Sequence, residues 1–157
     1  MDDPVATFIT RYKALGLDGT PASMEEVSAL EQEMGLTLPA AYKAFLLILG
    51  RDGGPDFVGS DCTIRHLPCL RAGAEDLLRQ CGSRYTLPEQ ALVYLMHQGY
   101  YFVYFLADGV SEDPPVFAYL EGDPAPVEKA ESFSAWLKLA TSRPAEHRSI
   151  NQEAHEL

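Results

Sequence analysis

Residues 91–106, ALVYLMHQGYYFVYFL, carry the strongest strand signal in the chain. Aliphatic, β-branched and aromatic residues are dense on both sides of His97-Gln98-Gly99, a composition typical of strands. A glycine in that tripeptide can adopt a positive φ, as a tight hairpin connection requires. The stretch therefore predicts two antiparallel strands joined by a turn at residues 97–99.

Helix signals precede this hairpin. Three stretches combine a start signal, apolar residues at helical spacing and a glycine after the last turn: residues 4–15, 23–34 and 39–49. Ser23 and Glu26 form a capping box in the second of them. The remaining expected elements are a strand at 57–64, a short helix at 72–81, a strand at 116–120 and a helix capped by Ser132 at 133–139.

The order of these elements indicates the fold class. Helices come first, strands gather in the middle, and one helix closes the chain. This order predicts an α+β fold with a mainly antiparallel sheet, helices at the N-terminus and one C-terminal helix. A length of 157 residues fits one domain, which we assign to residues 1–140, with a polar C-terminal tail at 141–157.

The charge balance favours some partners over others. Twelve basic and 23 acidic residues give a formal net charge of −11. Such a field repels phosphate backbones and anionic lipids, so we expect no direct binding of nucleic acid or membrane. It attracts basic proteins and speeds their association. The alternative is that the charge serves only solubility.

Features of cellular location point to the cytoplasm. The opening residues MDDP lack the basic and apolar regions of a signal peptide, and the apolar run at 100–107 is too short to span a membrane. Three cysteines, Cys62, Cys69 and Cys81, form no even disulfide framework. We therefore expect a cytoplasmic protein.

Catalytic and cofactor motifs are weak. Cys62, His66 and Cys69 have loose spacing and lack a fourth zinc ligand unless Cys81 supplies it. A Cys/His97 pair has no adjoining basic cluster to activate the thiol. The glycine-rich residues 51–56 lack the Gly-Lys-Ser/Thr of a phosphate loop. We expect no catalytic residue, metal or cofactor, while a small metal- or thiol-dependent enzyme stays an open alternative.

Aromatic residues offer a candidate binding surface. Unbroken alternation places Val93 on an aliphatic face and sets Tyr94, Tyr100, Tyr104 and Tyr119 on the other. Tyrosines tolerate partial exposure and are enriched at interface hot spots. We expect these four to contact a partner. A bulge would exchange part of this set, and the alternative is a second core layer covered by residues 57–87.

Acidic residues crowd the connections beside this sheet. The candidate partner-binding acids are Asp52, Asp56 and Asp61 on one side and Asp108, Glu112 and Asp113 on the other, and Glu121 and Asp123 extend the second group. Between residues 108 and 131 the only basic residue is Lys129. An acidic rim around exposed rings suits a basic protein partner, whereas the simpler reading is a solvated charged surface.

The sequence also resembles a known family. The acidic helix at 23–31, the Leu-Pro step at 38–39, the Tyr-x-x-Phe-Leu pattern at 42–46 and the Asp-Gly-Gly loop at 52–54 resemble the SUKH superfamily. The similarity is to the branch related to the yeast Smi/Knr cell-wall assembly regulator, and Asp52 stands where that branch usually has Asn.

Bacterial members of this superfamily are commonly immunity proteins that bind and neutralise a cognate toxin, often a nuclease, and the family has no known active site. The resemblance therefore implies a non-enzymatic inhibitor of a basic toxin domain. A regulatory or scaffold module that binds a host protein is the alternative. We expect a monomer or a weak homodimer, since an unpaired sheet edge can associate.

Overall fold

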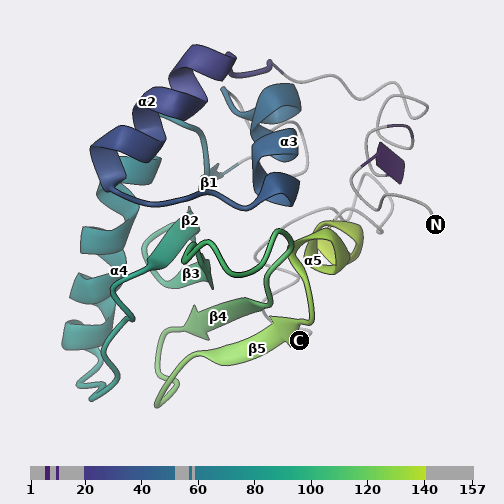
Figure 1. Ribbon diagram of the computed structural model, residues 1–157. Coiled ribbons are helices and arrows are strands. Elements are labelled where there is room, and N and C mark those ends of the chain that lie inside the picture. Colours follow the sequence, from purple (N-terminus) through teal and green to yellow (C-terminus); the bar gives the residue numbers. More distant parts are fainter. Residues whose placement is uncertain (1–5, 8–9, 11–19, 52–56, 58, 141–157) are drawn as a thin grey trace.

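The computed structural model describes residues 6–7, 10, 20–51, 57 and 59–140 (Figure 1). The named elements are α2 (Met24–Met34), α3 (Ala40–Leu49), β1 (Ser60–Asp61), α4 (Leu67–Gln80), β2 (Ala91–His97), β3 (Tyr101–Leu106), β4 (Val116–Leu120), β5 (Val127–Ala130) and α5 (Phe133–Ala140). This order confirms the predicted α+β fold. Most of the helix expected at 4–15, the residues Asp52 and Asp56, and the tail at 141–157 lie outside the described residues.

The five strands form one antiparallel sheet in the order β1-β2-β3-β4-β5. The predicted hairpin is confirmed, because His97 pairs with Tyr101 across the turn between β2 and β3. Gln98 and Gly99 in this turn have φ values of 49° and 79°. Glycine adopts that left-handed conformation without strain. Each strand pairs antiparallel with the next, so among the described strands β1 and β5 form the two edges.

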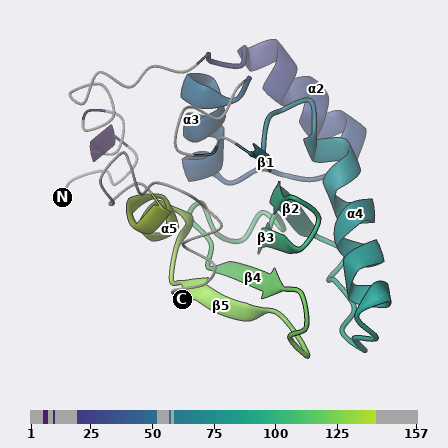
Figure 2. The same ribbon diagram turned by 180° about the vertical axis from the view of Figure 1, so that it is seen from behind.

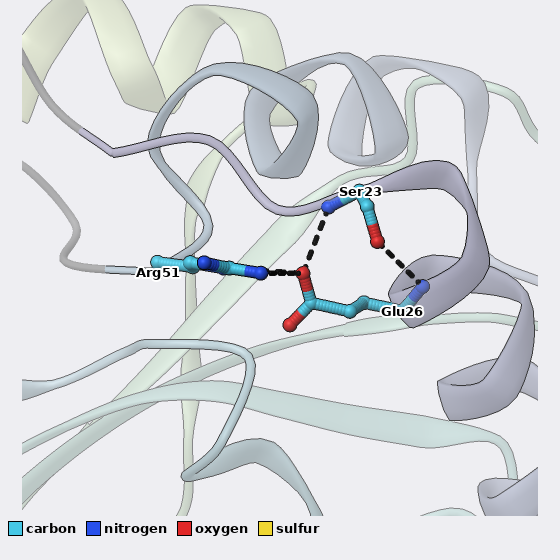
Figure 3. A network of polar contacts seen from close by, with 3 residues as sticks. All are labelled: Ser23, Glu26 and Arg51. Carbon is cyan, nitrogen blue, oxygen red and sulfur yellow. Dashed lines mark hydrogen bonds and ion pairs between the residues drawn. The ribbon is translucent and has the colours of Figure 1, made fainter.

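The predicted capping box opens α2 (Figure 3). Ser23 Oγ accepts a hydrogen bond from the Glu26 backbone N–H (3.1 Å), and Glu26 Oε1 accepts one from the Ser23 N–H (3.0 Å). The same oxygen accepts bonds from Nε and Nη2 of Arg51, at 3.1 and 2.8 Å. These bonds, that of Arg51 foremost, lower the pKa of Glu26. They tie the start of α2 to the chain just after α3.

The segment between α3 and β2 differs from its prediction in two places. Residues 57–64 were expected to form one strand, but among the residues described in this stretch only Ser60–Asp61 pairs with the sheet. The chain turns away because the Ile64 N–H donates to the Gly50 carbonyl (2.7 Å) instead of to a strand. The helix expected at 72–81 is α4, which begins earlier, at Leu67, with Pro68 in its first turn.

One face of the sheet packs on α3 and α5 through an aromatic cluster. Tyr42 of α3 meets Phe133 of α5 edge-on, with ring centroids 5.3 Å apart, and lies 5.1 Å from Phe105 of β3. All three rings are fully buried. Aromatic pairs of this kind are worth about 0.5–1.5 kcal/mol beyond the burial of their area. The cluster therefore fixes both helices against the sheet.

The opposite face is covered by α4 and the residues that follow it. Gly73 of α4 lies so close to Met96 of β2 that a Cβ there would sit 3.5 Å from the methionine sulfur. Phe102, which pairs with Met96, stacks on Tyr119 with ring centroids 5.4 Å apart. Figures 1 and 2 show α4 on one side of the sheet and α5 on the other. Both faces of the sheet are therefore covered.

Candidate functional site

Most of the tyrosines expected to form a binding surface lie in the core. Tyr94, Tyr104 and Tyr119 each expose 2% or less of their surface, and only Tyr100 is partly exposed. The prediction of an exposed aromatic surface is therefore wrong for these three. The alternative, a second core layer beneath residues 57–87, is confirmed for Tyr104, whose hydroxyl bonds the Tyr85 hydroxyl.

The pKa values of the buried phenols reflect their surroundings. Burial and the hydrogen bond with Tyr85 raise the pKa of Tyr104. Burial, with the Cys81 thiol beside the hydroxyl, raises the pKa of Tyr119 to about 12. These phenols stay neutral at physiological pH and serve packing.

A bulge in β2 explains the position of Tyr94. The register between β2 and β3 shifts between Val93 and Leu95, so that Val93 pairs with Tyr104 and shares its face. Tyr94 instead stacks on Phe105 with ring centroids 5.0 Å apart, on the side of α3 and α5. Because a bulge adds one residue to a strand, it reverses the alternation on one side of itself. The expected faces of Val93 and Tyr94 are therefore exchanged.

The loop between β3 and β4, residues 108–115 and below called the acidic loop, caps α3. Pro39 precedes this helix, and no side-chain cap comes from it. Glu112 supplies the cap: its Oε2 accepts from the Ala40 N–H and its carbonyl from the Ala41 N–H, both at 3.0 Å. A carboxylate at this position also offsets the positive end of the helix dipole. Glu112 is thus fixed to a helix 72 positions away in sequence.

The next residue of the acidic loop caps α5. Asp113 Oδ1 accepts from the Ser134 N–H at 2.9 Å. Ser132 Oγ accepts from the Ala135 N–H at 3.0 Å, which confirms the predicted cap at Ser132. Two adjacent carboxylates therefore hold two helices that lie far apart in the sequence.

The beginning of the acidic loop is exposed to solvent, and its backbone is held in place by contacts with the rest of the chain. Asp108 forms an isolated bridge with Thr37, and its Oδ1 accepts from the Val110 N–H at 2.9 Å. Val110 is 86% exposed, the highest value among the large apolar side chains of the described chain. Glu112 is exposed as well. The loop thus presents an apolar side chain between two carboxylates, Asp108 and Glu112, and both ends of this stretch are anchored.

The predicted acidic rim is divided by the structure. Asp108, Glu112 and Asp113 share the acidic loop, but Asp61 lies on the edge strand β1, with a carboxylate oxygen 3.8 Å from His66 Nε2. Glu121 follows β4 and therefore lies at the other end of the strands. The structure does not describe Asp52 and Asp56. One acidic surface, rather than a continuous rim, is the candidate site.

The cysteines and histidines considered for metal binding or catalysis do not form a cluster. Cys62 is buried, Cys69 is exposed on α4 and Cys81 is half-buried. His97 Nδ1 is hydrogen-bonded to Ser60 Oγ at 2.8 Å, and burial lowers the pKa of this histidine. Within the part of the chain that the structure describes, no three His, Cys, Asp or Glu side chains are grouped to hold a metal ion.

Val110 was not among the residues expected to contact a partner. Its sequence context, Asp-Gly-Val-Ser-Glu-Asp, gives no signal for such a role, because single exposed apolar residues are common on protein surfaces. The anchoring of its loop by Glu112 and Asp113 has no sequence signal, because both helices that they cap are distant in the chain.

Comparison with known protein families gives a match. The family model described as SMI1 / KNR4 family (SUKH-1) matches residues 21–139, about three quarters of the chain. No curated protein matches the sequence. None of the helices among the described residues has the length and apolar character needed to cross a membrane.

Proposed function

Because the chain belongs to the SMI1/KNR4 family (SUKH-1), we propose that it is a non-enzymatic protein-binding domain that acts as an immunity protein. It neutralises a cognate toxin, of the nuclease type, by direct binding. The acidic loop forms the contact surface. It binds the toxin in the cytoplasm, where a toxin that attacks nucleic acid must also act.

The observation that carries this proposal is the anchored, outward-facing acidic loop. Glu112 and Asp113 cap two helices, so the backbone between them and Asp108 is held before any partner arrives. A surface fixed in advance loses little conformational entropy on binding. Val110, exposed among these carboxylates, supplies the apolar contact of the proposed interface, whose surround is polar.

Charge supports the same partner class. Residues 108–131 contain seven acidic residues and one basic residue, Lys129. A nuclease presents cations that bind the phosphates of its substrate. An acidic inhibitor is steered to that surface, and it blocks access once bound. Complexes of this class reach dissociation constants around 10⁻¹³–10⁻¹⁶ M.

Co-expression with the toxin domain encoded beside this chain tests the proposal. Rescue of growth and co-purification of the two proteins are expected, with association that slows as salt rises. If the purified pair does not associate at low salt, the proposal is wrong. If a pull-down instead recovers a housekeeping protein and toxin challenge has no effect on growth, the regulatory or scaffold alternative takes its place.

The acidic loop allows charge to be tested apart from folding. Asp108→Asn, Glu112→Gln and Asp113→Asn keep a side-chain oxygen that accepts the same backbone hydrogen bonds while removing three charges. The matched control is Glu25→Gln, Glu121→Gln and Glu128→Gln, three exposed acids outside the acidic loop. Weakened rescue is expected from the first set alone.

A further inference from the structure

A shallow groove lies where α2, α4 and the start of β2 meet. Its volume is about 270 Å³. Met34, Leu36 and Pro68 line it with apolar surface, and Glu33 and Glu89 bring carboxylates to it. Figure 1 shows the C-terminal end of α2 beside the first turn of α4. The groove thus pairs an apolar floor with negative charge.

Among the described residues, Arg71 is the one basic residue that lines this groove, and its guanidinium already contacts other groups of the protein. Its Nη1 donates to the carbonyls of Pro88 (2.8 Å) and Ala91 (3.3 Å), and its Nη2 to that of Leu87 (3.2 Å). Its Nε lies 3.6 Å from a carboxylate oxygen of Glu75. These partners fix the guanidinium and balance its charge.

The negative charges of the two carboxylates in the groove are not balanced by an ion pair within the described part of the chain. Glu33 and Glu89 are exposed, and neither forms an ion pair with any residue that the structure describes. Once the Arg71–Glu75 pair is set aside, the groove carries two negative charges. Its charge is therefore complementary to a cation.

Size and shape select the kind of cation. Pockets for small-molecule ligands commonly measure 300–1,000 Å³ and enclose most of the ligand. At about 270 Å³ this groove suits a single side chain. Lysine and arginine lay an aliphatic stem along apolar surface while the charged head stays near water, which matches an apolar floor with carboxylates beside it.

The groove lies next to the acidic loop. Leu36 immediately precedes Thr37, whose backbone bridges Asp108. On the other side, the Ala107 N–H donates to the Gln90 carbonyl at 2.8 Å, beside Glu89. A protein that covers the acidic loop can therefore reach the groove as well.

We infer that this groove receives a lysine or arginine side chain of the protein partner that binds the acidic loop. The inference rests on the proposed function for its partner, but the groove itself is defined by the free protein. Glu33 and Glu89 hold the charged head, and Met34 and Leu36 contact the stem.

The test uses the isolated full chain, labelled with ¹⁵N, and four blocked amino acids: the N-acetyl methylamides of arginine, lysine, norleucine and glutamate. At low salt the arginine and lysine probes should shift the amide signals of Glu33, Leu36 and Glu89, with dissociation constants in the millimolar range. Norleucine should bind at least about fivefold more weakly, because it keeps the stem and lacks the charge.

Two charge-matched variants locate the effect. Glu33→Gln with Glu89→Gln should weaken arginine and lysine binding about fivefold, while Glu25→Gln with Glu128→Gln should leave it unchanged. Both pairs remove two exposed acids, so the change in stability should be small in either.

Three results would overturn the inference: shifts spread evenly over all acidic residues, equal loss in both variants, or preferential binding of the glutamate probe beside Arg71. None of these involves a toxin. A failure here therefore leaves the co-expression result untouched, and a failed co-expression leaves the groove measurement valid.

Discussion

On the face of the sheet that α4 covers, polar groups are buried among apolar ones. In the acidic loop, an apolar side chain is exposed among carboxylates. On the covered face, the ring of Tyr104 is buried and its hydroxyl bonds the Tyr85 hydroxyl. In the acidic loop, Glu112 and Asp113 bond helix ends while Val110 remains in solvent. The first arrangement stabilises the core. The second fixes a surface that has no partner among the described residues, which is what a binding site requires.

The largest effect should come from the covered face. Phe102 is fully buried and stacks on Tyr119, so Phe102→Ala should lower the free energy of unfolding by about 3–5 kcal/mol. Val110→Ala, in the exposed loop, should change it by less than about 0.5 kcal/mol. Urea denaturation followed by circular dichroism measures both. Similar losses in the two variants would remove the distinction between the regions.

The helix caps should give an intermediate effect. Asp113→Ala removes the acceptor for the Ser134 N–H and should cost about 0.5–2 kcal/mol of stability. Asp113→Asn keeps an acceptor oxygen and should cost distinctly less. Thermal unfolding of the two variants compares them directly. If both lose the same stability, the charge of Asp113 matters and its cap does not.

Two buried hydroxyls should respond in opposite directions, by smaller amounts. Tyr42 is fully buried and its hydroxyl has no hydrogen-bond partner among the described residues, so Tyr42→Phe should leave stability unchanged or raise it by up to about 1 kcal/mol. Tyr104→Phe breaks the bond with Tyr85 and should lower stability by about 1 kcal/mol. The urea concentrations at the unfolding midpoints, compared at a constant m-value, distinguish the two variants. A clear loss in Tyr42→Phe would mean that its hydroxyl is satisfied.

Local signals made much of the fold predictable. The capping box of Ser23 and Glu26 and the hairpin at residues 97–99 each depend on residues a few positions apart. The predictions of the fold were wrong where contacts between residues distant in the sequence determine the structure. The bulge between Val93 and Leu95 leaves no mark in the alternation, and it exchanges the face of Tyr94.

The candidate site was predictable in composition but not in geometry. Its acids stand out in the sequence of residues 108–113. That Glu112 caps α3 depends on a contact between positions 72 apart, and the burial of Tyr104 and Tyr119 depends on where α4 and the residues after it pack. Sequence patterns identify the groups, whereas tertiary packing determines which of them a partner can reach.

The most direct test of the proposed function is the rate at which the protein associates with a toxin domain encoded beside it. The variant with Asp108→Asn, Glu112→Gln and Asp113→Asn should fold as the parent does and associate about tenfold more slowly at low salt. The control with Glu25→Gln, Glu121→Gln and Glu128→Gln should slow less, and high salt should remove the difference. An unchanged rate in the first variant, or an equal decrease in both, would contradict the role of the acidic loop.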